Sequence, residues 1–290
     1  MLFAGGLWKI YLSWQNRVFV SGTRLTVVAA QENPTLYSYS PSSRELTIIV
    51  IPKNTQVEAA GGYGSWSVGS LWDLGNQEGK GGEVLRNTVM KAFGIPVDGW
   101  VGPDGEDLFK NEALSFPVKV FKAISSGSIK TDLTFFDRLS LLSIGAVSSS
   151  RRGSLDLEAK GVLAKKRLPD GVEGFIIIPE RGKIVFEELR DSALLNERKT
   201  AFVFNATGKA GLAGQAVQVV STLGIRVIGA GKGEEKIEDC QIRVKEKDSG
   251  SISARKLSRI FGCRMITGGF TESASSDIEI LLGEGFAKRF

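Results

Sequence analysis

A strand–helix–strand pattern in the last third of the chain constrains the fold most strongly. Residues 201–204 are apolar, and a polar turn containing glycine follows at 205–209. The next stretch, 211–223, carries apolar side chains on one helical face, and Gly224 ends the helix before a second apolar strand at 225–228. This order predicts a compact strand–helix–strand unit.

Three further segments extend this unit. A short strand is predicted at 242–244, a helix closed by glycine at 254–261, and a terminal strand at 277–282. The polar stretch 196–200 is the best domain boundary. We therefore expect a small C-terminal α/β domain over residues 200–290, with two helices on a short sheet.

The upstream part alternates strands and helices, which is typical of an α/β domain. The predicted elements are a strand at 24–30, hairpin strands at 36–39 and 45–51, a loop at 61–64, a helix at 82–93 closed by Gly94, a helix capped by Thr131 or Asp132, a loop at 148–154, a strand at 175–178 and a helix at 184–194. One larger α/β domain is expected over residues 22–195.

The first 21 residues form a separate apolar and aromatic segment. Only eight residues precede the first charge, Lys9, whereas a membrane-spanning helix needs about 20. Trp8, Tyr11 and Trp14 suit a membrane boundary. We favour a membrane-proximal segment or the tail of a longer anchor over the alternative, a helix packed on the domain.

The chain has no histidine, which excludes several kinds of active site. Ser-His-Asp and Cys-His nucleophilic sites, histidine general bases and His-ligated zinc all need this residue. The two cysteines, Cys240 and Cys263, are too few for a zinc site. Either they pair, in a domain outside the cytoplasm, or they are two small buried apolar residues.

The net charge of +5 suits an anionic partner. A phosphate-rich polymer or a membrane surface would fit. We expect no nucleic-acid partner, because the sequence has no stripe of basic residues interleaved with aromatics and no reading motif.

Four segments in order give the C-terminal third a family resemblance. They are residues 202–208 (FVFNATG), 211–213 (GLA), 223–224 (LG) and 276–283 (SDIEILLG). Together they resemble the C-terminal domain of LytR–CpsA–Psr cell-envelope proteins. The resemblance implies an accessory or binding module on the extracytoplasmic side of the cell membrane.

The upstream part resembles the catalytic domain of the same family over residues 24–101. Residues 46–57 (LTIIVIPKNTQV) resemble a strand and loop that read Ile-Pro-Arg-Asp-Thr in the family, and residues 62–64 and 94–98 continue the match. This implies a three-layer α/β domain. The family's enzymes are thought to move a glycopolymer from a polyprenyl pyrophosphate onto peptidoglycan, with arginines and magnesium on the pyrophosphate.

This sequence departs from the family where that chemistry takes place. Lys53 replaces the arginine and Asn54 the aspartate, and within residues 31–35 only Thr35 matches an Arg-x-Asp-Thr element. Lysine lacks the bidentate fork of arginine, and asparagine cannot act as a base. The resemblance therefore implies a degenerate enzyme.

Six residues remain as candidates for a binding site. Lys53, Arg86 and Lys91 are candidate phosphate-binding residues, with solvated surface charges as the equal alternative. The candidates for a polar pocket are Asn54, Thr35 and Asp98.

Two glycine-rich segments resemble phosphate loops in composition but not in spacing. Residues 208–214 read Gly-x-x-Gly-x-x-Gly, which is not the Gly-x-Gly-x-x-Gly of a dinucleotide loop. Residues 229–233 lack the pattern of a P-loop. We expect residues 229–233 to be a turn, and residues 208–214 to join a strand to a helix.

The hypothesis that follows is a membrane-tethered, non-catalytic module that binds cell-wall glycopolymer, a polyprenyl-phosphate lipid or another envelope protein. The alternative is a magnesium-dependent glycopolymer transferase that uses Lys53 and acids such as Glu32, Asp73 or Asp98. Magnesium is expected only under this alternative.

Overall fold

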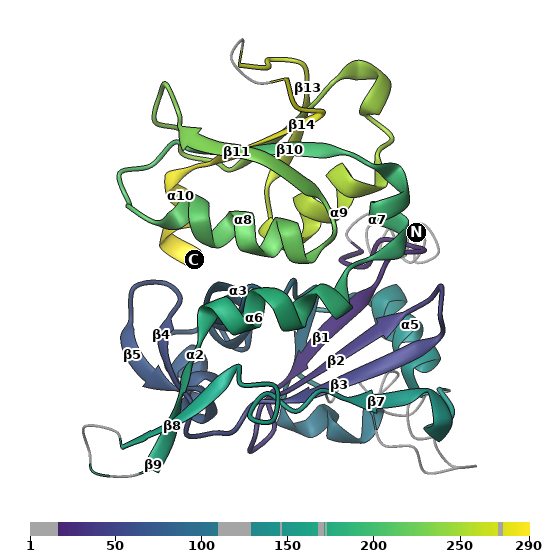
Figure 1. The fold of residues 1–290 in the computed structure, drawn as a ribbon, viewed down its shortest axis with the longest axis vertical. Helices are drawn as coiled ribbons and strands as arrows, with labels where there is room; N and C mark the ends of the chain where they lie inside the picture. Colours follow the sequence, from purple (N-terminus) through teal and green to yellow (C-terminus); the bar gives the residue numbers. More distant parts are fainter. Residues whose placement is uncertain (1–16, 110–128, 146, 168–170, 172, 272–274) are drawn as a thin grey trace, which may run out of the picture.

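The computed structural model describes residues 17–109, 129–145, 147–167, 171, 173–271 and 275–290, which form two five-stranded sheets with helices (Figure 1). Most of the predicted membrane-proximal segment, residues 1–16, lies outside this part of the chain. Within the described residues, none of the helices is long and apolar enough to cross a membrane.

The first sheet has the strand order β6-β1-β2-β3-β7. Its strands are β1 (Leu25–Ala29), β2 (Thr35–Ser40), β3 (Glu45–Val50), β6 (Gly99–Val101) and β7 (Arg152–Ser154). The predicted hairpin is present, because β2 pairs antiparallel with both β1 and β3. The edge strands β6 and β7 run parallel to their neighbours.

Helices cover both faces of this sheet. Alternate residues of β1 point to opposite faces, as a strand requires. Val28 joins a core cluster with the apolar faces of α2 (Leu71–Gln77) and α3 (Glu83–Phe93). Val27 joins a second cluster with α5 (Phe135–Gly145). The predicted three-layer α/β arrangement is therefore confirmed.

Short elements connect this sheet to the rest of the chain. They are the hairpin strands β4 (Gln56–Ala59) and β5 (Gly64–Ser67), β8 (Leu163–Arg167) and β9 (Glu173–Ile177), the 3-10 helices η1 (Val68–Ser70), η2 (Pro103–Leu108), η3 (Ser149–Arg151) and η4 (Phe186–Leu189), and the helices α6 (Pro179–Val185) and α7 (Ser192–Glu197).

Several predicted boundaries were wrong. The loop expected at 148–154 includes β7, whose pairing with β3 no local pattern reveals. The helix expected at 184–194 is broken, because the Asp191 side chain caps α7 by accepting from the Ala193 amide. The cap of α5 is Thr134, whose hydroxyl accepts from the Asp137 amide, and not Thr131 or Asp132.

The second sheet has the order β11-β10-β14-β12-β13. The elements of this C-terminal part are β10 (Thr200–Asn205), α8 (Leu212–Thr222), β11 (Arg226–Lys232), β12 (Gln241–Val244), η5 (Glu246–Asp248), α9 (Ile252–Phe261), β13 (Arg264–Thr267), β14 (Ile278–Leu282) and α10 (Glu284–Arg289). The predicted strand–helix–strand unit is β10-α8-β11, with the two strands parallel. The two predicted helices are α8 and α9, and β13 and α10 were not predicted.

The helices α8, α9 and α10 lie between this sheet and the first domain (Figure 1). Apolar residues from both domains consequently join one buried core cluster, which includes Phe93 of α3 and Val219 of α8. Gly94 ends α3 with φ of 69°, and a Cβ on it would lie 2.4 Å from the Gln218 side chain. Gln218 also donates to the Phe93 carbonyl. The two domains are therefore packed directly on each other.

The two cysteines form a disulfide between residues that precede β12 and β13. The Cα atoms of Cys240 and Cys263 are 4.6 Å apart, and both residues are buried. Of the two alternatives left open by the sequence, the structure has the paired one.

Acidification is expected to weaken the attachment of α7 to α9. Glu197 accepts hydrogen bonds from the amides of Ile252 and Ser253 and from the Ser251 hydroxyl, at the beginning of α9. Burial raises the pKa of Glu197, but these hydrogen bonds outweigh burial and lower it. A lowered pKa gives stability that is complete above the unfolded value of about 4.3 and is lost as the pH falls through the folded value.

This prediction can be measured by urea unfolding between pH 3 and pH 7. Glu197→Gln should lower the free energy of unfolding by about 1 kcal/mol at pH 7. Its free energy of unfolding should also fall less steeply with acidification than that of the wild type. Glu246→Gln, on an exposed residue of the same domain, is the control. Identical acid limbs for Glu197→Gln and the wild type would contradict the assignment.

Candidate functional site

The three basic candidates do not form one pocket. Lys53 follows β3, and its ammonium group pairs with the Glu32 carboxylate at 2.6 Å, with both side chains exposed. Arg86 and Lys91 lie on α3. Arg86 faces the second domain, whereas Lys53 contacts the loop before β2, where Asn33 accepts from its amide.

The guanidinium group of Arg86 is bound to backbone. Its Nε donates to the Val97 carbonyl at 3.0 Å, and one Nη donates to the Ile260 carbonyl at 2.7 Å. The other Nη donates to the Asn87 side chain at 3.3 Å. Clamping a phosphate would require this fork to give up its carbonyl partners.

Lys91 of α3 lies within reach of the charge of Lys209, which belongs to the second domain. Burial lowers the pKa of Lys91, and the charge of Lys209 lowers it further, while Glu58 opposes the shift. A role for Lys53 or Lys91 in binding phosphate stays a prediction.

The three polar candidates are also separated. The Thr35 hydroxyl donates to the Asn33 carbonyl at 2.9 Å, and the Asn54 amide donates to the Glu173 carbonyl at 2.7 Å. Thr35 is the first residue of β2, and Asn54 lies in the loop after β3, next to Lys53. Asp98 instead lies at the contact between the domains.

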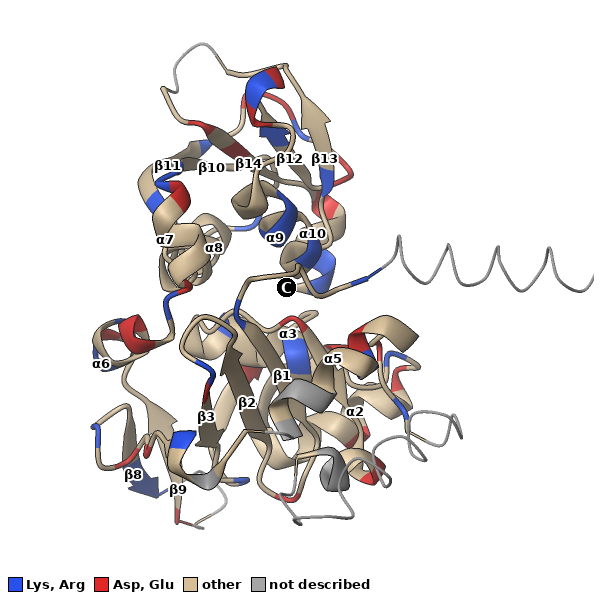
Figure 2. Cartoon of the chain, turned by 90° about the vertical axis from the view of Figure 1, so that its right-hand side faces the viewer, with Lys and Arg blue, Asp and Glu red and all other residues tan. Residues whose placement is uncertain are grey.

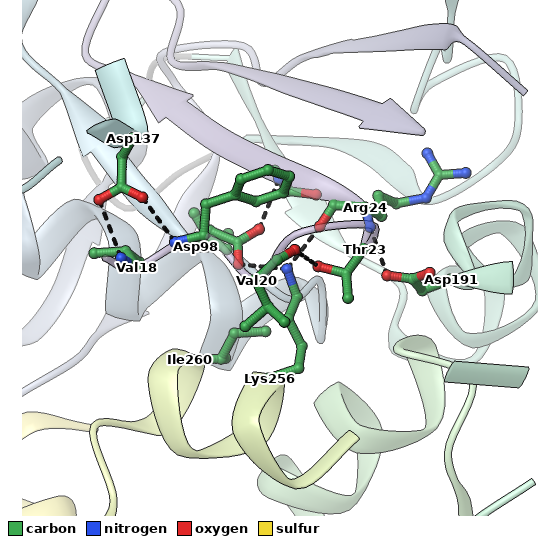
Figure 3. A network of polar contacts seen from close by, with 12 residues as sticks. Val18, Val20, Thr23, Arg24, Asp98, Asp137, Asp191, Lys256 and Ile260 are labelled. Carbon is green, nitrogen blue, oxygen red and sulfur yellow. Dashed lines mark hydrogen bonds and ion pairs between the residues drawn. The ribbon is translucent and has the colours of Figure 1, made fainter. Parts of the chain in front are cut away.

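Asp98 forms a buried ion pair with Lys256 of α9 (Figure 3). The Lys256 ammonium group is 2.5 Å from Asp98 Oδ1 and donates to the Arg24 carbonyl at 2.6 Å. Asp98 Oδ2 accepts from the Thr26 amide at 2.8 Å, and both charged side chains are 1% exposed. Burial raises the pKa of Asp98, and Lys256 acts against this. The pair therefore joins the two domains.

Lys256 is not among the residues predicted from the sequence, although the apolar face of α9 indicates that it is buried. Helix α9 buries Ala254, Leu257 and Ile260, and Lys256 belongs to the same buried face. A lone lysine on an apolar helical face requires a buried acceptor.

Two further carboxylates complete the polar network in Figure 3. Asp191 Oδ2 accepts from the Arg24 amide. The Asp137 oxygens accept from the amides of Val18 and Phe19, each at 3.0 Å. Together with Lys256 of the second domain, which donates to the Arg24 carbonyl, these carboxylates hold the chain that enters β1.

The described residues contain no group of three or more His, Cys, Asp or Glu side chains that could hold a metal ion. Of the acids considered for the transferase, Glu32 pairs with Lys53, Asp98 pairs with Lys256, and Asp73 is exposed on α2.

One family model matches part of the chain. Residues 200–286 match the family model described as LytR cell envelope-related transcriptional attenuator, which confirms the resemblance of this segment. A search of curated proteins found no match.

Three solved structures of Bacillus subtilis proteins resemble more than half of this chain. TagV has a TM-score of 0.44 and 13% identity, covering 59% of this chain and 97% of its own. YwtF (TagT), a LytR-CPS2A-psr family protein with bound octaprenyl pyrophosphate lipid, has a TM-score of 0.41 and 18% identity, covering 59% and 91%. TagT bound to LIIa-WTA has a TM-score of 0.42 and 14% identity, with the same coverage.

Proposed function

From the premise that residues 200–286 form a LytR C-terminal domain, we propose that the chain is a non-catalytic envelope protein that binds cell-wall glycopolymer or polyprenyl phosphate. It acts on the extracytoplasmic side of the membrane, to which its N-terminal segment tethers it. Other envelope proteins are the further class of partner.

The non-catalytic part of this proposal rests on Arg86 and Asp98, because structural contacts already engage the charges of both side chains. The Arg86 fork is bound to the backbone of both domains, and Asp98 is neutralised by Lys256. A transferase needs these charges free to hold a pyrophosphate and to activate a hydroxyl. Here they fix the position of the C-terminal domain.

Two observations support the location and the ligand class. The Cys240–Cys263 disulfide suits an oxidising compartment outside the cytoplasm. The net charge of +5 favours an anionic partner.

The whole chain is expected to bind without turnover. A ligand that binds only the folded state stabilises it by about 2.7 kcal/mol at a hundredfold excess over its Kd. A phosphate-bearing wall glycopolymer or polyprenyl phosphate should therefore raise the Tm. A polyprenyl-pyrophosphate-linked glycan should stay intact at every magnesium concentration tested.

The Lys53→Ala variant distinguishes the proposed binding function from the transferase alternative. Turnover by the wild type that is lost in Lys53→Ala would overturn the proposal in favour of the magnesium-dependent transferase. A chain that binds neither polymer nor lipid would overturn the binding function and leave envelope proteins as partners. Binding without turnover supports the proposal.

A further inference from the structure

The two glycine-rich segments meet in the C-terminal domain, and the turn expected at 229–233 was wrong, because residues 229–232 belong to β11. Strands β10 and β11 are parallel neighbours, with Asn205 opposite Lys232 at their carboxyl ends. Residues 208–214 follow β10 and residues 229–233 end β11. Crevices at the carboxyl ends of parallel strands are common ligand sites in open α/β sheets.

These segments line a cavity of about 540 Å³. Lys209, Lys232 and Lys236 contribute to its wall, and no described acidic residue does. The Lys236 ammonium group lies 3.8 Å from the position of a Cβ on Gly208. Glu284 accepts from the Gly208 amide at 3.4 Å but does not line the cavity.

The lysines differ in how far their charges are engaged. The Lys209 ammonium group donates to the Ala287 carbonyl at 3.3 Å. Within the described part of the chain, neither Lys232 nor Lys236 forms an ion pair. Their charge is therefore available to an anion from solvent.

A second cavity, of about 460 Å³, continues along α8. Lys183 and Arg190 line it, opposite Val217 of the helix. Its one acidic wall residue among the described residues is Glu187, which pairs with Arg190 at 2.6 Å. Both cavities include Gly214, so they adjoin on α8.

Helix α8 carries no charge of its own over its 11 residues (Figure 2). Eleven residues correspond to about 16 Å of helix. Cations from three other parts of the chain therefore flank a neutral surface that is longer than a single phosphate group. A bound dinucleotide fits less well, because Lys232 stands where that fold places an acidic residue after the second strand.

We infer that a linear, phosphate-bearing glycopolymer binds along α8, with successive phosphates in the lysine crevice and beside Lys183 and Arg190. This inference rests on the proposed function and gives it a site in the C-terminal domain. An extended polyanion is favoured over one headgroup, because the cations occupy both cavities.

A single glycine where the cavities adjoin allows a sharp test. A Cβ on Gly214 meets no atom within 4 Å, so a side chain can begin there in open space. Gly214→Glu places a carboxylate on the path of the polymer, and Gly214→Gln is the neutral control of the same size. With a labelled poly(glycerol phosphate), Gly214→Glu should bind at least tenfold more weakly than Gly214→Gln.

Paired lysine variants provide a second measurement. Lys232→Gln with Lys236→Gln should weaken polymer binding at least tenfold. Lys166→Gln with Lys247→Gln removes the same charge from exposed positions elsewhere and should change binding less than twofold. Inorganic phosphate and vesicles carrying polyprenyl phosphate serve as comparison ligands for the wild type.

The outcomes separate this site from the proposed function. Polymer binding that is equal in Gly214→Glu and Gly214→Gln, or lost equally in both lysine pairs, would overturn the α8 site while the binding function stands. A wild type that binds vesicles but not polymer would also overturn the site. A wild type that binds neither would overturn the proposed function itself.

Discussion

Replacing Lys256 with methionine is expected to lower the free energy of unfolding by about 3–5 kcal/mol. Methionine fills a similar volume, so the packing of α9 is largely kept. Asp98, however, remains 1% exposed and loses its ion-pair partner. An unpaired buried carboxylate costs far more than the loss of an exposed pair.

The pH dependence of this variant provides its own check. Burial raises the pKa of Asp98, and without Lys256 only the Thr26 hydrogen bond and the charge of Arg86 oppose that effect. A carboxyl with a raised pKa in the folded state is protonated there at pH values where the unfolded chain is ionised. The variant should therefore lose stability as the pH rises above about 4, relative to the wild type.

Chemical unfolding measures the stability of Lys256→Met and of two control variants. Lys247→Met changes an exposed lysine and should stay within about 0.5 kcal/mol of the wild type. Lys256→Met combined with Asp98→Leu should recover most of the loss, because the unpaired charge is removed. A Lys256→Met variant as stable as the wild type at pH 7 would contradict a structural role for the pair.

The sequence was sufficient to predict elements whose signals are local. The helix closed by Gly94, the hairpin of β2 and β3, and the β10-α8-β11 unit all have their own periodicity and their own stop residue. Strands β7 and β13 have only three and four residues, and their neighbours in the sheet define them. A local pattern cannot supply such long-range pairing.

The candidate site was harder to predict than the fold for a related reason. The sequence shows that Arg86 and Asp98 can bind phosphate or metal, but it does not show which partner occupies them. That partner is the C-terminal domain, through the Ile260 carbonyl and Lys256. Neither glycine-rich segment matches a phosphate loop by itself. Only the parallel pairing of β10 and β11 places the two segments in one cavity.

Removal of the Cys240–Cys263 disulfide is expected to be the second large effect. The bond closes a loop between residues separated by 23 positions, which in the chain-entropy account corresponds to about 3 kcal/mol. Both cysteines are buried in the core, so Cys240→Ala with Cys263→Ala is preferable to serine, which would bury two hydroxyls.

Urea unfolding of the oxidised wild type, the reduced wild type and the double alanine variant separates the contributions. The reduced protein and the variant should both unfold about 3 kcal/mol more easily than the oxidised protein. An oxidised protein no more stable than its reduced form would contradict a stabilising bond. Because Cys240 precedes β12 and Cys263 precedes β13, the loss should fall mainly on the edge of the second sheet. A larger increase in amide hydrogen exchange in β13 than in β10, each compared with the oxidised wild type, would report this directly.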